Sequence, residues 1–396
     1  MTQSTPKKDG ATGRSGPVGL FLLLSAALLL AAVPVFAATE IENGLLRVSF
    51  DDATGRLTGF KDLRNGHDFV GAQDSEGLWQ IDLLSRAGDT AITPSAAKAF
   101  HAWRSEGGTT ATLVWEGFGA HHGAGLRVTA TVALADKEPM SQWRIAVEGL
   151  DGVSPATVRF PRVSNITPQE QETLAIPVWM GERTTRAREL LHGAGRFEWE
   201  YPGLLSMQCV ALYRENGPGL YAACDDTAAR AKRFAIFGQP DKALAFELTQ
   251  LPESGSGNAT RYESPYNVLL GTFEGDWFTA AERYRGWALR QSWAKQSRLD
   301  TGGVADWVGK TGLWIWNRGR SDGVLGPALA LQERAQLPVS VFWHWWHGCP
   351  YDVGFPEYLP PREGEEPFRK ALNDAQTKGV HALVYMNQRL WGMTTK

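Results

Sequence analysis

The sequence predicts a multi-domain chain in which a large antiparallel β-sandwich precedes the first three β/α units of a parallel barrel. From Glu40 to about Phe273, short apolar runs alternate with a period of two residues and are broken by Gly, Asp, Asn and Pro. This pattern is typical of antiparallel strands. After Gly303 it changes to strand, helix, strand, helix, strand. Strands separated by helices pair in parallel through right-handed crossovers, which is how a TIM-type (β/α)8 barrel begins.

The composition indicates a folded protein without a nucleic-acid partner. The chain has 396 residues, with 40 basic and 43 acidic side chains, and a formal net charge of -3. Nucleic-acid binding requires a basic surface that neutralises phosphates, and this charge balance argues against one. Hydrophobic residues make up 43% and charged residues 21%. A chain of this composition can bury large cores.

Residues 1–38 are predicted to be a secretory signal peptide. Basic residues precede an apolar run over 18–33, and Pro34 and Ala37 follow where a peptidase site belongs. An uncleaved membrane anchor is the alternative, because the run approaches the ~17 residues of the shortest span. With cleavage, the mature protein is expected to be secreted or periplasmic and to have no membrane partner. The oligomeric state is left open.

Residues 39–275 are assigned to the sandwich domain. Its first hairpin is predicted over 45–50 and 56–60, with a turn between them. Further alternating runs lie at 78–84, 112–115, 126–134, 142–147, 157–162, 204–213, 234–237 and 244–248. Strands that follow one another without helices favour an antiparallel sandwich.

Two cysteines lie on the runs that flank the turn signal at 215–218. If Arg214 pairs with Gly219, Cys209 falls opposite Cys224. A cross-strand disulfide and two buried free thiols are both compatible with this register, and free thiols are favoured because unpaired cysteine is commonly buried.

Residues 276–303 are assigned to a connecting helix and linker. Asp276 is the expected N-cap, since its side chain can accept from the first free backbone N–H groups. Apolar residues follow at intervals of three and four, namely Trp277, Ala280, Ala281, Tyr284, Trp287 and Ala288. A polar, glycine-containing stretch over 297–303 ends this region.

Residues 304–396 are assigned to an incomplete barrel. Strands are predicted at 313–316, 339–343 and 380–385. One helix is expected to begin near Pro327, because proline is tolerated at the first helical position, and another to run from Pro367 to a cap at Gly379. A complete barrel needs eight strands in about 250 residues. The sequence therefore predicts a truncated product.

Aromatic and polar residues gather where these strands end. The candidate substrate-binding residues are Trp316, Asn317, Trp343, His344, Trp345, Trp346, Asp352 and Asn387. The carboxyl ends of barrel strands form the active face. Aromatic rings stack on the apolar face of a sugar, and amides, carboxylates and imidazoles bind its hydroxyls. The pattern predicts a carbohydrate site, and the alternative is that the tryptophans pack in the core.

The catalytic residues are unknown from the sequence. Glycoside hydrolysis uses two carboxyl groups about 5–10 Å apart. Asp352 is the best-placed acid, followed by Asp322 and Glu357, but each can equally bind a sugar hydroxyl or cap a loop. His344 and His347 lie on opposite faces while the strand persists and lack a third ligand nearby, so no metal site and no cofactor are predicted.

Several segments together resemble secreted bacterial glycosidase-like proteins that join a galactose-mutarotase-like β-supersandwich to a catalytic (β/α)8 barrel. They are residues 42–50 with 54–57, the helix at 284–288, and 343–347 with 350–352 and 356–358. The tryptophan-rich segment resembles the domain of unknown function 6259, and the chain is distantly similar to endo-α-N-acetylgalactosaminidases. In related barrels the catalytic carboxylates come from the fourth and later strands. The resemblance therefore transfers no catalytic residue to this chain.

The sequence thus predicts a carbohydrate-active, glycoside hydrolase-like protein that acts on or binds an oligosaccharide or polysaccharide and stops before its catalytic carboxylates. The alternatives are a non-catalytic carbohydrate-binding protein and an inactive fragment.

Overall fold

The computed structural model divides into two compact units, residues 1–280 and 281–396. The structure describes residues 38–71, 77–85, 88–119, 125–192, 195–253, 260–349, 354–387 and 391–392. The predicted signal peptide thus lies outside the described residues, except for Ala38 in the first strand. In the described part of the chain, every helix is too short or too polar to cross a membrane.

The first unit is built from short strands. They are β1 (Ala38–Glu42), β2 (Leu46–Asp51), β3 (Leu57–Asp62), β4 (Gln80–Ser85), β5 (Thr90–Ile92), β6 (Ala99–Arg104), β7 (Thr110–Glu116), β8 (Arg127–Leu134), β9 (Met140–Glu148), β10 (Val153–Ile166), β11 (Glu172–Ile176), β12 (Glu182–Thr184), β13 (Arg196–Tyr201), β14 (Cys209–Arg214), β15 (Gly217–Cys224), β16 (Lys232–Gly238), β17 (Leu244–Gln250), β18 (Arg261–Glu263) and β19 (Val268–Gly275). A short helix, α1 (Ala187–Leu190), interrupts them.

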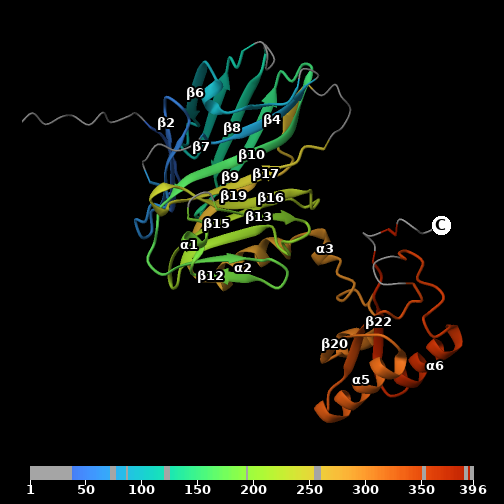
Figure 1. Cartoon of the computed structure of the whole chain (residues 1–396). Coiled ribbons are helices and arrows are strands. Elements are labelled where there is room, and N and C mark those ends of the chain that lie inside the picture. Colours follow the sequence, from blue (N-terminus) through green and yellow to red (C-terminus); the bar gives the residue numbers. More distant parts are fainter. Residues whose placement is uncertain are drawn as a thin grey trace, which may run out of the picture. The chain divides into compact units, whose positions relative to one another are not determined.

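These strands form three antiparallel sheets (Figure 1). One sheet contains β1, β2 and β3. The second has the order β13-β16-β17-β10-β4-β5. The third has the order β12-β11-β14-β15-β19-β9-β8-β7-β6, with β18 also paired to β9. The prediction of a mostly antiparallel β region is confirmed.

One continuous hydrophobic core joins the three sheets. Phe50 on β2 packs edge to face against Trp143 on β9, with ring centroids 5.7 Å apart. Trp143 in turn lies 6.1 Å from Phe160 on β10. All three rings are buried, so aromatic side chains from each sheet fill the space between the layers.

The predicted first hairpin is present as β2 and β3, in which Val48 pairs with Phe60. Gly55 in its turn has φ 73°. A Cβ at this position would lie 2.4 Å from the Trp115 side chain. Glycine is therefore required both by the backbone conformation and by the closeness of the indole.

The register of the β14–β15 hairpin differs from the prediction by one residue. Tyr213, rather than Arg214, pairs with Gly219, and Cys209 pairs with Ala223. Cys224 therefore points to the opposite face from Cys209, since adjacent residues of a strand alternate. Both are free, buried thiols, as favoured from the sequence. The observed turn between β14 and β15 is shorter than the predicted one, because only Glu215 and Asn216 separate the strands, and Asn216 has a left-handed backbone with φ 54°.

A buried ion pair lies at the start of β16. Lys232 Nζ is 2.8 Å from Asp226 Oδ2, and both side chains are almost inaccessible. The ammonium also donates to the carbonyl of Arg230 and to Gln208 Oε1. Three acceptors thus satisfy the three donors of the lysine, which offsets part of the cost of burying its charge.

The helix predicted after the sandwich is α2 (Trp277–Ala288). Asp276 Oδ1 accepts from the backbone N–H groups of Phe278 and Thr279, at 2.9 and 3.3 Å. The predicted N-cap is therefore confirmed, because these are two of the donors that the first turn of a helix leaves free.

The second unit contains a short parallel β/α region. Its elements are α3 (Ser292–Lys295), α4 (Asp306–Lys310), β20 (Leu313–Arg318), α5 (Ser321–Ala335), β21 (Val339–His344), α6 (Glu365–Gln376) and β22 (His381–Val384). β21 lies between β20 and β22 and pairs in parallel with both. The predicted order of three parallel strands and two crossover helices is confirmed.

Helix α5 begins earlier than predicted. It starts at Ser321, and Pro327 lies inside it. The predicted start at Pro327 is therefore wrong. The side chain of Glu363 accepts from the backbone N–H and the hydroxyl of Ser321, at 3.0 and 3.1 Å, and so satisfies a free donor of the first turn.

Candidate functional site

The two faces of the parallel sheet differ. Helices α5 and α6 pack on one face around a hydrophobic core (Figure 1). Val339, Val341 and Trp343 of β21 point into this core and are fully buried. The intervening side chains of the strands point to the other face, which we call the open face. Its members are Trp314, Trp316, Phe342, His344 and Leu383.

Aromatic rings cover the open face. His344 stacks on Tyr385, with ring centroids 4.1 Å apart and planes inclined by 14°. Trp316 lies 5.1 Å from His344 on its other side, and Phe342 meets His344 edge to face at 4.8 Å. Trp316 is 56% exposed and Phe342 is 38% exposed. The row Trp316, His344 and Tyr385 therefore crosses the carboxyl ends of all three strands.

Helix α4 closes the amino-terminal end of this face. Trp307 stacks on His381 with centroids 4.5 Å apart and also contacts Trp314 at 5.7 Å. Since Trp307 occupies this end, the surface that can receive a ligand lies toward the carboxyl ends, where Trp316 is exposed.

An arginine lies beside two of these indoles. The guanidinium carbon of Arg318 is 4.5 Å from the ring centroid of Trp345 and 5.5 Å from that of Trp316. Trp345 has φ 55°, and its carbonyl accepts from Arg362 Nε at 3.0 Å. The guanidinium of Arg318 thus contacts both indoles and helps to hold the loop after β21 against β20.

The imidazole of His344 is half-buried between its aromatic neighbours, and both ring nitrogens are covered. Neither ring nitrogen has a hydrogen-bond partner within the described ranges. Burial, and then the proximity of His347, lower the pKa of His344. The ring is therefore neutral at neutral pH, with one nitrogen that can donate and one that can accept.

Trp343 and Trp346 lie in the core. Trp343 is fully buried, packs 5.2 Å from Phe368 of α6, and donates Nε1–H to the carbonyl of Gly319 at 2.9 Å. Trp346 is 7% exposed and donates to the carbonyl of Tyr385 at 2.8 Å. The structure separates these two indoles from the open face, so they correspond to the alternative of core packing.

The two predicted asparagines make structural contacts. Asn317 Nδ2 donates to the carbonyl of Gly323 at 3.1 Å. The backbone carbonyl of Asn387 accepts from the hydroxyl of Tyr358 at 2.8 Å. Asp352 lies outside the described residues. Of the predicted substrate-binding residues, the open face and its rim bring together Trp316, His344 and Trp345.

His347 does not extend this surface. Its ring is buried, and Nδ1 lies 2.9 Å from Cys349 Sγ and 3.1 Å from the Cys349 carbonyl oxygen. Across the residues that the structure describes, no three His, Cys, Asp or Glu side chains are grouped so as to hold a metal ion.

Two residues around His344 were absent from the predicted set, namely Phe342 of the open face and Tyr385, which directly follows β22. Phe342 and Tyr385 complete the stack around His344. Strict alternation along 339–344 places Phe342 with His344, and this periodicity was the available signal. The position of Tyr385 beside His344 depends on the register between β22 and β21, which the sequence pattern does not specify.

Comparisons with known proteins relate this two-part chain distantly to putative glycoside hydrolases. Residues 262–396 match the family model described as "Domain of unknown function (DUF6259)". A Bacteroides thetaiotaomicron protein named "Putative glycoside hydrolase" is 23% identical over 273 residues, which are 68% of this chain and 38% of that protein. "Putative glycoside hydrolase 22789" of Monosiga brevicollis is 25% identical over 205 residues, 46% of this chain and 17% of its own length. The chain is thus distantly related to these proteins and spans less than half of either.

The fold is similar to that of a solved glycosidase. One such structure is the alpha-N-acetylgalactosaminidase NagBb from Bifidobacterium bifidum, whose quadruple mutant aligns with this chain with a TM-score of 0.61 at 15% sequence identity. The alignment covers 87% of this chain and 58% of that chain. A complex of NagBb with GalNAc gives the same TM-score and covers 90% of this chain and 60% of that one. This likeness establishes the shared fold over both the sheets of the first unit and the parallel region.

Proposed function

We propose that this chain is the sandwich and barrel start of a carbohydrate-active, glycoside hydrolase-like protein, and that its open face contacts an oligosaccharide or polysaccharide. The observation that carries the proposal is the row Trp316, His344 and Tyr385 at the carboxyl ends of three parallel strands. Such ends form the ligand-binding face of (β/α)8 proteins.

The exposed aromatic side chains support the assignment of this sheet to the beginning of a barrel. Parallel sheets are normally covered on both faces, and here α5 and α6 cover only one. In a closed barrel the second face is the interior, where further strands surround it. The first unit then corresponds to a galactose-mutarotase-like supersandwich, and the similarity in fold to NagBb supports this interpretation.

The side chains suggest distinct roles in sugar binding. Trp316, half exposed and flat, is the stacking platform. Arg318 lies beside it and can donate to ring substituents. The ring nitrogens of neutral His344 are covered by their neighbours, so this ring supports Trp316 and Tyr385 by packing rather than by donating to the sugar. Asp352 remains a candidate acid, and the catalytic pair is left unassigned. Export through residues 1–38 is part of the proposal.

Sugar binding tests the proposal directly. Calorimetric titration of the full chain with a panel of oligosaccharides, including ones that end in α-linked N-acetylgalactosamine, should detect a binder. Trp316→Ala should weaken its binding at least tenfold. Trp293→Ala is the matched control, because Trp293 is a similarly exposed tryptophan on α3, at 53%. Equal losses in both variants, or no binding by any member of the panel, would refute the proposed surface.

Hydrolysis separates the enzyme from the non-catalytic alternative. The same panel is incubated with the chain, and released reducing ends are measured. Binding without release would favour a carbohydrate-binding protein that retains the surface, whereas release by this chain would require a carboxyl pair within it.

A further inference from the structure

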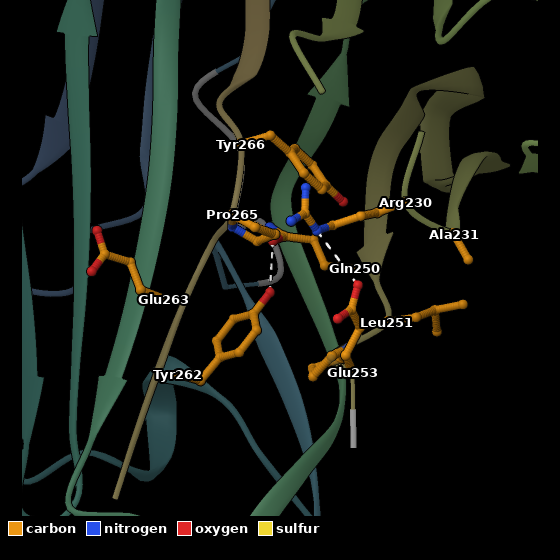
Figure 2. Close-up of a pocket in the computed structure, with 10 residues that line it drawn as sticks. Arg230, Ala231, Gln250, Leu251, Glu253, Tyr262, Glu263, Pro265 and Tyr266 are labelled. Carbon is orange, nitrogen blue, oxygen red and sulfur yellow. Dashed lines mark hydrogen bonds and ion pairs between the residues drawn. The ribbon is translucent and has the colours of Figure 1, made fainter. Parts of the chain in front are cut away.

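The first unit contains a pocket that is separate from the open face. It has a volume of about 200 Å³ and lies where β17 ends and β18 begins. Figure 2 shows its lining. The segment that carries Tyr262 and Tyr266 lies on one side, and Arg230 with residues 250–253 lies on the other.

One polar group in this pocket lacks a partner. The Tyr266 side chain lines the pocket and is 5% exposed, yet its hydroxyl has no hydrogen bond to any residue that the structure describes. The ring itself is fixed, because Lys232 Nζ lies 4.6 Å from its centroid. Buried hydroxyls are nearly always hydrogen-bonded in folded proteins, so this one indicates a missing partner.

The other polar groups of the lining are held in place. Tyr262 donates its hydroxyl to Gln250 Oε1 at 2.8 Å (Figure 2). Ser264 donates to the same oxygen at 2.9 Å, and Gln250 Nε2 donates to the carbonyl of Phe160. The carbonyl oxygen of Gln250 thus accepts two hydrogen bonds, and its amide is anchored to Phe160. Tyr266 and the exposed part of Arg230 are the groups of the lining that we expect to meet a ligand.

The charges around the pocket are balanced. Arg230 lies 3.3 Å from buried Asp226 and 3.6 Å from Glu253, which is 82% exposed. Glu263 is paired with Arg261 at 2.9 Å. Each charge of the lining therefore has an opposite partner, so the pocket has no excess charge with which to attract an ionic ligand. A neutral molecule with several hydroxyls fits this arrangement.

The size and the apolar part of the lining favour a sugar ring. Leu251, Pro252 and Pro265 contribute apolar surface beside the polar groups. Binding sites for small ligands combine such surface with a few placed polar groups. We propose that this pocket binds one neutral sugar residue, with a hydroxyl paired to Tyr266 and another to Arg230, whose long contact with Glu253 it replaces.

The test uses the full chain and a panel of neutral monosaccharides, namely galactose, glucose, mannose and N-acetylgalactosamine, with glucuronate as an anionic comparison. Binding is measured by saturation-transfer NMR and by calorimetry. At least one neutral sugar should bind, and Tyr266→Phe should weaken it at least tenfold. The thermal midpoint of this variant should be unchanged or higher, since the substitution removes an unpaired buried hydroxyl.

Two control variants locate the effect. Tyr213→Phe removes the hydroxyl of another buried tyrosine, on β14 and outside the pocket lining, and should leave sugar binding unchanged. Trp316→Ala alters the open face and should also leave it unchanged, so failure of the open-face proposal is distinguishable from failure here. Absence of binding by every neutral sugar, tighter binding of glucuronate, or unaltered binding by Tyr266→Phe would overturn the proposal.

Discussion

Asn317 donates its side-chain amide to the carbonyl oxygen of Gly323, over 3.1 Å. In an uninterrupted helix this oxygen accepts from the backbone nitrogen four residues later, which here belongs to Pro327 and has no hydrogen. Asn317 at the end of β20 therefore supplies the donor that the proline lacks. The contact explains how α5 continues through Pro327, and it gives Asn317 a structural role beside the open face.

This relationship predicts an energetic coupling between the two positions. Asn317→Ala should lower the free energy of unfolding by about 0.5–1.5 kcal/mol, because it leaves the Gly323 carbonyl without this donor. Pro327→Ala restores the helical N–H, so the same asparagine substitution made in that background should cost less. Denaturant unfolding of the four proteins gives the coupling, and additive effects would contradict the proposed compensation.

Trp343 and Trp316 should respond oppositely to truncation. Trp343→Ala removes a fully buried ring from the core beneath α6 and should cost about 3–5 kcal/mol of unfolding free energy. Trp316→Ala removes a ring that is 56% exposed and should cost less than about 1.5 kcal/mol. Urea unfolding followed by far-UV circular dichroism measures both. A comparable cost at the two positions would show that the open face is covered in solution.

These tryptophans show what the sequence could predict. Strand positions, parallel pairing and the Asp276 cap follow from local periodicity and side-chain chemistry. Trp343 and Trp345, however, are equally aromatic and lie in one short segment. Which of them is buried depends on the packing of α6 and on the left-handed backbone at Trp345, neither of which is a local property. The same limit applies to the β14–β15 register, which depends on the length and backbone conformation of the turn.

The buried pair of Asp226 and Lys232 should make stability sensitive to acid. Burial raises the pKa of the Asp226 carboxyl, but the hydrogen bond and charge of Lys232 and two backbone N–H donors outweigh it, so the pKa is lowered overall. A lowered carboxyl pKa adds stability above the unfolded-state value, and this stability is lost as pH falls through the folded-state value. We expect the unfolding free energy to drop below about pH 4, as denaturant titrations at several pH values can measure.

Substitution of that pair provides the control. Asp226→Asn leaves the buried ammonium without its counter-ion and should cost about 3–5 kcal/mol. It should also flatten the acid dependence. Adding Lys232→Met removes the uncompensated charge, so the double variant should be more stable than Asp226→Asn alone. An unchanged pH profile in Asp226→Asn would assign the acid sensitivity to other carboxylates.

The buried thiols should be unreactive in the folded protein. Burial raises the pKa of Cys209 to about 12, and burial is also the main cause of the raised pKa of Cys224. Since the thiolate is the reactive form, a thiol reagent at pH 8 should label Cys349 first and the other two cysteines only after unfolding.

Oxidation should not join Cys209 to Cys224, because they point to opposite faces of the hairpin. Peptide mapping after timed labelling tests both expectations, and a Cys209–Cys224 disulfide in native protein would contradict the observed register.

The neutral imidazole of His344 should make the second unit more stable at neutral pH than in weak acid. Burial lowers its pKa below the ordinary 6.5, so between the two values the unfolded chain binds more protons than the folded one. The contribution of the neutral imidazole to the unfolding free energy should therefore be complete above pH 6.5 and decrease as pH falls through that window.

His344→Phe keeps a ring to stack on Tyr385 but cannot titrate, and it should reduce the slope of unfolding free energy against pH. Phe342→Leu, which alters the neighbouring ring without removing a titratable group, should shift the whole curve and keep its slope. Equal slopes for His344→Phe and the unmodified chain would mean that the imidazole is solvated rather than enclosed by its aromatic neighbours.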